Sequence, residues 1–314
     1  MHLGNVFCAL LSWLSAKSQG GEWLLRIEDL DPQRSRREYA DQLMDDLEWL
    51  GLTWDNTPVW QSERSDIYAH YLKKLQERHL IYPCFCTRAD ILATQAPHES
   101  DGRIVYKGTC RPKNGALPEL PTTPATLRMM VPDAVIPFID GHYGRHDINL
   151  TEHCGDYIVR RKDGAWAYQL AVVVDDALMG VTEIVRGRDL LLSSPQQIHL
   201  RQTLFADDPT VPADLRFYHH PLLCNAEGQR LCKRDKSLDL GYLREAGATP
   251  EAIIGRLAHL AGLIPENRPT RPEELLKNFK WSQVPLEDIL IKESRTLKII
   301  LWSMQSSGLF IIYY

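Results

Sequence analysis

The sequence lacks several features that would assign it to a broad class of protein. It contains no apolar run that approaches the roughly 20 residues needed to cross a bilayer, which excludes a membrane-spanning helix. The apolar stretch from His2 to Ala9 is short and has no basic segment before it, so no signal peptide is recognisable. No internal repeat or low-complexity segment occurs. We therefore expect a cytoplasmic, monomeric, globular protein with no membrane partner.

An excess of positive charge is also missing. The 314 residues include 36 Lys and Arg against 41 Asp and Glu, which gives a formal net charge of −5. This balance argues against a uniformly basic surface that binds nucleic acid without regard to shape, although a local basic face is compatible with it. At this length we expect one large domain with an insertion, or two domains.

Cysteine usage does not fit a disulfide framework. The seven cysteines are an odd number, and three of them, Cys84, Cys86 and Cys110, lie close together. Thiolates are soft metal ligands, so this group suits a metal site in a reducing compartment. The surrounding segment, 83–123, has little hydrophobic periodicity, so it needs something other than a large apolar core to hold its structure. By chemistry alone His98 is a candidate fourth ligand, and three unligated loop cysteines are the alternative.

Hydrophobic periodicity predicts alternating helices and strands. The predicted helices span residues 6–18, 35–50, 65–77, 194–205, 250–260 and 271–279. The predicted strands span residues 23–27, 125–130, 156–160, 169–174 and 182–185. The run 169–174 is strongly apolar and is predicted to be a central strand that Asp175 and Asp176 end. Alternation of this kind indicates an α/β fold built on a doubly wound parallel sheet.

Two short motifs lie where ligands commonly bind. His2-Leu3-Gly4-Asn5 precedes a predicted helix, where backbone N–H groups attract phosphate and a glycine lets a ligand approach closely. Arg26-Ile27-Glu28-Asp29-Leu30-Asp31-Pro32 follows a predicted strand, and its three carboxylates are candidates to hold an ammonium group. The alternatives are a chance N-terminus for the first motif and, for the second, a solvated turn in which Asp31 caps a helix that starts at Pro32.

Seven motifs in a fixed order carry a resemblance to a known family. They are H-L-G-N, R-I-E-D-L-D-P, G-L-T-W-D, W-Q-S-E-R, V-V-V-D-D, G-V-T-E-I-V-R-G-R-D-L and R-L-C-K-R-D-K-S. Over residues 2–265 this set resembles the catalytic domains of glutamyl-tRNA synthetases, which are class I aminoacyl-tRNA synthetases. About eighty residues follow Lys233, too few for a large anticodon-binding domain. The chain is most similar to the short paralogues of the family, which attach glutamate to queuosine in the anticodon of tRNA(Asp).

The resemblance implies which residues bind ATP, the expected substrate, together with Mg2+. His2, Gly4, Asn5 and Lys233 match the ATP-binding positions, with His2 and Lys233 as the catalytic pair that neutralises the triphosphate. Lys233 lies in a loop that departs from the family pattern, because a cysteine replaces the usual serine before it and Arg230 replaces the first lysine.

The resemblance likewise implies a pocket for L-glutamate. Glu28 matches the contact to the amino group, Tyr168 matches a tyrosine that lines the pocket, and Arg186 matches the arginine that pairs with a substrate carboxylate. A planar guanidinium grips a carboxylate with two parallel hydrogen bonds, which favours glutamate over glutamine.

The family pattern also adds Tyr106 to Cys84, Cys86 and Cys110 as the fourth ligand of a zinc ion.

The resemblance also implies how the chain divides into domains. A Rossmann-like catalytic domain is expected in two halves, 1–82 and 156–238. Between them lies a zinc-bearing insertion and connective region, 83–155. A helical region, 239–296, and a tail without an assigned role, 297–314, follow.

In the family, a central strand upstream of H-L-G-N supplies an arginine and a serine that bind the amino acid, and this sequence begins at Met1 without them. We therefore expect the chain as given to activate glutamate weakly or not at all. Two further hypotheses stay open beside the paralogue that modifies tRNA(Asp). One is a truncated glutamyl-tRNA synthetase that charges a tRNA 3′ end, and the other is a catalytically dead module that binds tRNA.

Overall fold

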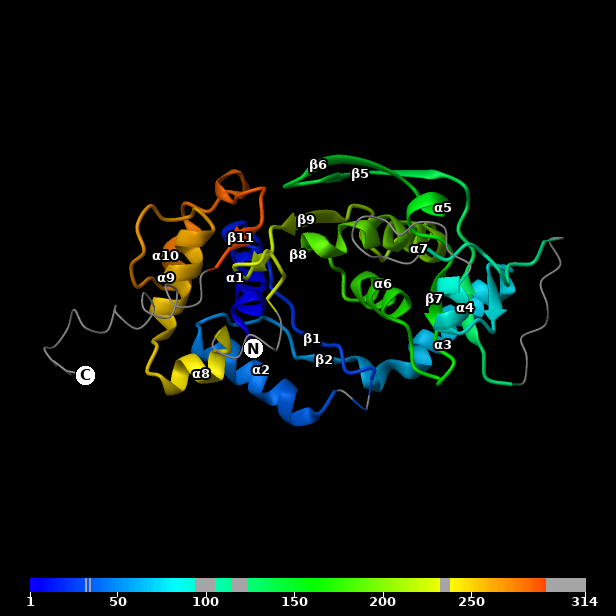
Figure 1. Ribbon diagram of the computed structural model, residues 1–314, viewed down its shortest axis with the longest axis horizontal. Coiled ribbons are helices and arrows are strands. Elements are labelled where there is room, and N and C mark those ends of the chain that lie inside the picture. Colours follow the sequence, from blue (N-terminus) through cyan, green and yellow to red (C-terminus); the bar gives the residue numbers. More distant parts are fainter. Residues whose placement is uncertain (32, 34, 94–104, 114–122, 232–237, 292–314) are drawn as a thin grey trace, which may run out of the picture.

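The computed structural model describes residues 1–31, 33, 35–93, 105–113, 123–231 and 238–291 (Figure 1). Its α-helices are α1 (Leu3–Ser18), α2 (Arg37–Trp49), α3 (Ser65–Glu77), α4 (Arg88–Ala93), α5 (Leu150–His153), α6 (Tyr168–Leu178), α7 (Ser194–Phe205), α8 (Leu240–Glu245), α9 (Pro250–Leu260) and α10 (Pro272–Leu276). Short 3-10 helices are η1 (Gln61–Arg64), η2 (Arg188–Ser193) and η4 (Trp281–Gln283). No helix in this part of the chain combines the length and the apolar character that crossing a bilayer requires.

The described strands pair in four sheets. They are β1 (Arg26–Ile27) with β2 (Val59–Trp60); β3 (Ile81–Cys84), β4 (Thr126–Met129) and β7 (Tyr157–Arg160) in that order; β6 (Gly144–Asn149), β5 (Val135–Asp140), β9 (Arg216–His220) and β8 (Glu183–Gly187) in that order; and β10 (Leu223–Cys224) with β11 (Ile289–Leu290). Pairing is parallel in β1–β2, β8–β9 and β10–β11 and antiparallel in the sheet of β3, β4 and β7. The architecture is mixed α/β.

The predicted helices at 6–18, 35–50, 65–77, 194–205 and 250–260 are present with small shifts at their ends, and the one at 271–279 is shorter. Four of the predicted strands are also present, although the strand predicted at 23–27 is reduced to two residues. The predicted tail, 297–314, lies outside the described residues.

The helix α1 forms the centre of the first of two large cores. Leu3, Val6, Leu10 and Leu14 recur at helical spacing and are fully buried. They pack with apolar residues of α2, α8 and α9. Figure 1 shows α1 beside α9 and α10, although these helices are far from it in the sequence. The start of α1 is tied to the start of α8, because the Leu240 N–H donates to the Met1 carbonyl over 2.6 Å.

The segment 169–174 is helical, and its prediction as a strand is wrong. It lies in α6, which buries Leu170 to Val174 in the second core, against α3, α7 and β7. A continuous apolar run hides its period, because a helix buried on all sides and a buried strand both need an apolar residue at every position. Asp175 and Asp176 therefore lie inside a helix.

Asp175 joins α6 to the segment that follows β2. Its carboxylate is fully buried and accepts hydrogen bonds from Gln61 Nε2 at 2.8 Å, Arg64 Nε at 2.7 Å and the Tyr68 hydroxyl at 2.7 Å. A buried carboxylate is tolerated only where such donors replace water. This one residue thus connects η1 and α3 to the helix that carries Tyr168 and Asp176.

We predict that Asp175→Asn destabilises the protein by about 3 kcal/mol, because the new amide N–H groups face donors and Arg64 loses its counter-charge in a part-buried site. Urea denaturation followed by circular dichroism measures the free energy of unfolding. Asp147→Asn is the matched control, because Asp147 pairs with Arg145 on the exposed face of β6. An unfolding midpoint of Asp175→Asn equal to that of the control would contradict the prediction.

Candidate active site

His2 caps the N-terminus of α1. Its Nδ1 accepts the backbone N–H of Gly4 at 3.1 Å, and the Asn5 side-chain oxygen accepts the backbone N–H of His2 at 3.3 Å. Gly4 permits this arrangement, since a Cβ at that position would lie only 3.0 Å from the imidazole. Because Nδ1 accepts, the proton of the neutral ring is on Nε2, a donor suited to a phosphate oxygen. The motif therefore combines a helix N-terminus with an oriented imidazole.

Lys233 lies outside the described residues, but the residues described on either side of it lie at the same helix end. A Cβ added to Gly4 would be 4.0 Å from Leu231 Cβ. His2 forms an isolated antiparallel bridge with Asp239. Arg230, which replaces the first lysine of the family loop, forms an ion pair with Asp189. The chain thus leaves and re-enters the described structure close to His2.

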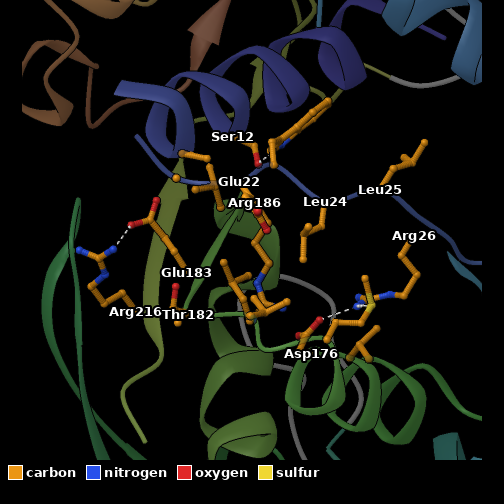
Figure 2. Close-up of a pocket in the computed structure, with 18 of the residues that line it drawn as sticks. Ser12, Glu22, Leu24, Leu25, Arg26, Asp176, Thr182, Glu183, Arg186 and Arg216 are labelled. Carbon is orange, nitrogen blue, oxygen red and sulfur yellow. Dashed lines mark hydrogen bonds and ion pairs between the residues drawn. The ribbon is translucent and has the colours of Figure 1, made fainter. Parts of the chain in front are cut away.

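A central cavity of about 690 Å³ brings together Glu28, Tyr168 and Arg186. Figure 2 shows Arg186 in this cavity. These residues come from the end of β1, the first turn of α6 and the end of β8. Ligand sites of α/β proteins gather at the carboxyl ends of strands, where Glu28 and Arg186 both lie. The structure therefore brings all three residues to the wall of one cavity.

Two strand segments form facing walls of this central cavity. Figure 2 shows Leu24, Leu25 and Arg26 on one side and Glu183 on the other. Among the described strands, β1 pairs only with β2 and β8 pairs only with β9, so each of these two strands has a second edge without a partner strand.

The acidic side of the cavity is built from Glu28 and Asp176, with Arg26 between them. Arg26 Nη2 lies 3.2 Å from Glu28 Oε1, and Arg26 Nη1 lies 2.6 Å from Asp176 Oδ1. Removal from water raises the pKa of Glu28 above its usual value, and Arg26 opposes this shift. The two carboxylates share the single arginine Arg26, so they can also bind a cationic group of a ligand that enters the cavity.

Arg186 forms the basic side. It is 8% exposed, and its donors reach His219 Nε2 at 3.0 Å, Gln197 Oε1 at 2.7 Å and Ser194 Oγ at 2.8 Å. Burial lowers its pKa below the usual value, and the nearby Tyr168 and Asp176 oppose that shift. Among the described residues no carboxylate lies within ion-pair distance of Arg186, so its buried charge has no acidic partner in direct contact. Such a group is suited to an anionic ligand.

The other two carboxylates of the R-I-E-D-L-D-P motif do not line the central cavity with Glu28. Asp29 accepts the backbone N–H and the hydroxyl of Ser62 at 2.8 and 2.6 Å. Asp31 lines a neighbouring cavity of about 500 Å³, which shares Glu28 and Tyr168 with the central one. Asp31 Oδ1 accepts the backbone N–H of Gln33 at 3.2 Å, and the next described helix, α2, begins at Arg37, while Pro32 lies outside the described residues.

The cysteine cluster of Cys84, Cys86 and Cys110 lies at the end of β3, away from the central cavity. Its three sulfur atoms lie within 4.8 Å of one another. The Tyr106 hydroxyl is 3.4 Å from Cys84 Sγ and 3.8 Å from Cys86 Sγ. Although desolvation opposes it, hydrogen bonds from the Phe85 backbone and the Tyr106 hydroxyl lower the pKa of Cys110 to about 7. His98, the other candidate ligand, lies outside the described residues.

Sequence reasoning missed the residues that hold Arg186 and the acidic partner of Arg26. Asp176 was visible in the V-V-V-D-D motif, but the wrong strand prediction placed it at the end of a strand. Ser194, Gln197 and His219 carry no signal in a single sequence, because polar residues scattered over a helix and a strand are also typical of solvated surfaces.

Comparison with known proteins identifies the family. Residues 1–289 match the family described as tRNA synthetases class I (E and Q), catalytic domain. The chain belongs to this class I tRNA synthetase family. The match includes the strands and helices that carry Glu28, Tyr168 and Arg186, so the central cavity lies within a synthetase catalytic domain.

Similar proteins within this synthetase family are named glutamyl-Q tRNA(Asp) synthetase. That of Symbiobacterium thermophilum is 44% identical over 93% of this chain and 92% of its own length. That of Nitratidesulfovibrio vulgaris is 41% identical over 92% and 91%. A solved glutamate tRNA ligase from Elizabethkingia meningosepticum, in complex with its amino acid, has a TM-score of 0.76 and 28% identity. The alignment covers 98% of this synthetase-family chain and 66% of that ligase.

We predict that Arg186→Gln raises the dissociation constant of L-glutamate by about 10- to 150-fold, because a hydrogen bond to a charged group is worth about 1.5–3 kcal/mol. Isothermal titration calorimetry with glutamate, and separately with ATP, measures the effect. Arg216→Gln is the control, since Arg216 lines the same cavity but is 54% exposed and pairs with Glu183 at 3.0 Å. Equal losses in the two variants would argue against a specific role for Arg186.

Proposed function

We propose that this chain activates L-glutamate with ATP and transfers the glutamyl group to queuosine in the anticodon of tRNA(Asp). The observation that carries the proposal is the similarity, over more than nine-tenths of both chains, to proteins named for this reaction. The central cavity supports it independently, because it offers carboxylates and a buried arginine to a small zwitterion with an additional carboxylate.

In this proposal the amino group of glutamate binds beside Glu28, and one of its carboxylates pairs with Arg186. Tyr168, 41% exposed, lines the wall of the pocket between them. Arg186 discriminates against glutamine, because an amide offers only one oxygen and would place its N–H₂ against a guanidinium. Selection for glutamate then depends on one fixed cation.

ATP is the second substrate, with Mg2+, as in other class I synthetases. We propose that His2, Gly4 and Asn5 at the start of α1 bind its phosphates and that Lys233 joins them from the loop that follows Leu231. A carboxylate oxygen of glutamate attacks the α-phosphorus, and pyrophosphate leaves. No protein nucleophile takes part, so catalysis comes from positioning and from neutralising the charge that develops on the phosphates. The parallel pairs β1–β2 and β8–β9 support a Rossmann-like, doubly wound arrangement around this site.

We also propose that Cys84, Cys86, Cys110 and Tyr106 bind a structural zinc ion. Tetrahedral zinc with Zn–S bonds of about 2.3 Å places two sulfur ligands about 3.8 Å apart. The Sγ atoms of Cys86 and Cys110 are 3.4 Å apart, and the Tyr106 hydroxyl lies at comparable distances from two sulfurs. Among the described residues of the insertion, a small cluster of buried apolar side chains surrounds them, and a metal would add stability to it.

The acceptor is tested with ATP, radiolabelled glutamate and two forms of tRNA(Asp), one with queuosine and one with unmodified guanosine. We expect label only on the queuosine-containing tRNA. The label should persist when the 3′-terminal adenosine has been removed beforehand. Label that requires the 3′ adenosine, in either tRNA, would instead establish a glutamyl-tRNA synthetase, and tRNA binding without any adenylate would establish a non-catalytic module.

The zinc proposal predicts about one zinc per chain by elemental analysis, and a lower melting temperature after chelation with 1,10-phenanthroline. Cys86→Ser should lose the metal, because removing one of four ligands leaves an incomplete shell. Cys154→Ser is the control and should keep the metal, since Cys154 lies outside the cluster. Metal content that is the same in both variants, or absent from the wild-type protein, would refute the site.

A further inference from the structure

Arg186 is held by a row of residues that crosses three neighbouring strands. Asp140 is the last residue of β5, His219 lies in β9 and Arg186 lies in β8. In the parallel pair β8–β9, Arg186 is the direct partner of His219, and β5 pairs with β9 beside it. Asp140 is 1% exposed and His219 is fully buried. Neither residue lines the central cavity, so both reach a ligand only through Arg186.

The contact between Arg186 and His219 requires one particular tautomer of the imidazole. Arg186 Nε donates to His219 Nε2 over 3.0 Å, so Nε2 must present a lone pair and the ring proton must be on Nδ1. Asp140 Oδ2 lies 2.6 Å from Nδ1 and accepts that proton. A guanidinium has only donors, so the opposite tautomer would place two N–H groups against each other.

Asp140 is itself fixed as an acceptor. Its Oδ1 receives the backbone N–H groups of His142 at 3.0 Å and Tyr143 at 2.8 Å, and Oδ2 receives that of His219 at 3.1 Å. Burial would raise the pKa of Asp140, but the hydrogen bonds from His219 and from these backbone groups lower it. Burial lowers the pKa of His219, which keeps the ring neutral. The backbone hydrogen bonds therefore hold Asp140 as an acceptor, and this acceptor fixes the tautomer of His219.

The direct partners of Arg186 leave its charge for a ligand. His219, Gln197 and Ser194 are neutral acceptors that take three of its five N–H groups, and Tyr168, which lines the central cavity, is a further hydroxyl beside it, so the full positive charge remains. An acidic residue in place of any of them would neutralise the arginine and weaken its attraction for a carboxylate. Neutral acceptors orient the group without this competition.

We propose that Asp140 and His219 are positioning residues that set the orientation of Arg186 and thereby the affinity and selectivity for the carboxylate of the amino-acid substrate. This inference rests on the proposed function, because it assigns the carboxylate of L-glutamate to Arg186. Neither residue touches substrate. Asp140 acts on the tautomer of His219, and His219 acts on the direction of the guanidinium.

Asp140→Asn tests the series of contacts from Asp140 through His219 to Arg186 at the residue farthest from the ligand. The amide oxygen must take the place of Oδ1, where two backbone N–H groups converge, so the amide nitrogen falls opposite His219 Nδ1. The amide N–H₂ group donates to Nδ1, so the ring proton must move to Nε2. There it faces the N–H of Arg186 Nε. We expect the dissociation constant of glutamate to rise about 10- to 100-fold while that of ATP stays within about twofold, since one buried donor loses its acceptor.

Two substitutions of His219 separate positioning from stability. In His219→Asn the amide nitrogen replaces Nδ1 and still donates to Asp140, but no atom accepts from Arg186. In His219→Gln the longer side chain places its amide oxygen near the former Nε2. We expect His219→Gln to bind glutamate clearly more tightly than His219→Asn, although both lower the melting temperature. Equal losses in glutamate affinity would overturn the positioning role.

His220→Gln is the control for loss of a buried histidine. His220 is the next residue of β9, 3% exposed, and its ring packs edge-on against Phe7 of α1 instead of Arg186. It should lower stability without changing the ratio of glutamate to ATP affinity. A wild-type protein that binds no glutamate would overturn the proposed function and this inference together. Glutamate bound equally well by wild type and Asp140→Asn would overturn this inference alone.

Discussion

The buried charge of Arg186 constrains the residues around it. A cation at 8% exposure costs free energy that its surroundings must offset, and here the direct partners are neutral acceptors on β9 and α7. The nearest strand, β9, supplies the histidine, and the first turn of α7 supplies the serine and the glutamine. The four-stranded sheet and α7 therefore hold a cation whose charge is left for a ligand, and this accounts for several buried polar side chains in an otherwise apolar region.

The acidic half of the cavity depends on a different element. Asp175 and Asp176 are adjacent in α6, and their hydrogen bonds go to different partners: Asp175 to Gln61, Arg64 and Tyr68, Asp176 to Arg26. Arg26 Nε also lies 3.8 Å from Asp175 Oδ2. The first set holds α6 against η1 and α3, and the second brings Arg26 to the cavity wall beside Glu28. Stability and ligand geometry are thus coupled through two consecutive carboxylates, because a shift of α6 that breaks one set of bonds also displaces the other.

The sequence predicted most of the helices well, because several of them bury one face and leave a clear period, as α2, α3 and α9 do. It failed at 169–174, where burial on every side removes the period. It also did not show that the side chains of Asp29 and Asp31 have other partners than the central cavity that Glu28 lines. Glu28, Tyr168 and Arg186 were predictable only through the resemblance to a family. The supporting residues Asp140, Ser194, Gln197 and His219 were not, because their role arises from the register between strands and the packing of α7, which no local pattern encodes.

The position of α1 limits what kind of ligand can use both ends of the site. His2 caps its first turn, whereas Ser12 and Ala16 line the central cavity. At 1.5 Å per residue, Ser12 lies about 15 Å along the helix axis from His2. Glutamate is no longer than one or two residues of extended chain, each roughly 3.3–3.6 Å, so it cannot contact both places. A nucleoside triphosphate can serve both places only if its α-phosphate lies beside the amino acid, where the carboxylate attacks, and its outer phosphates extend toward His2. The separation between the start of α1 and the central cavity therefore favours a two-substrate reaction over the binding of a single small molecule.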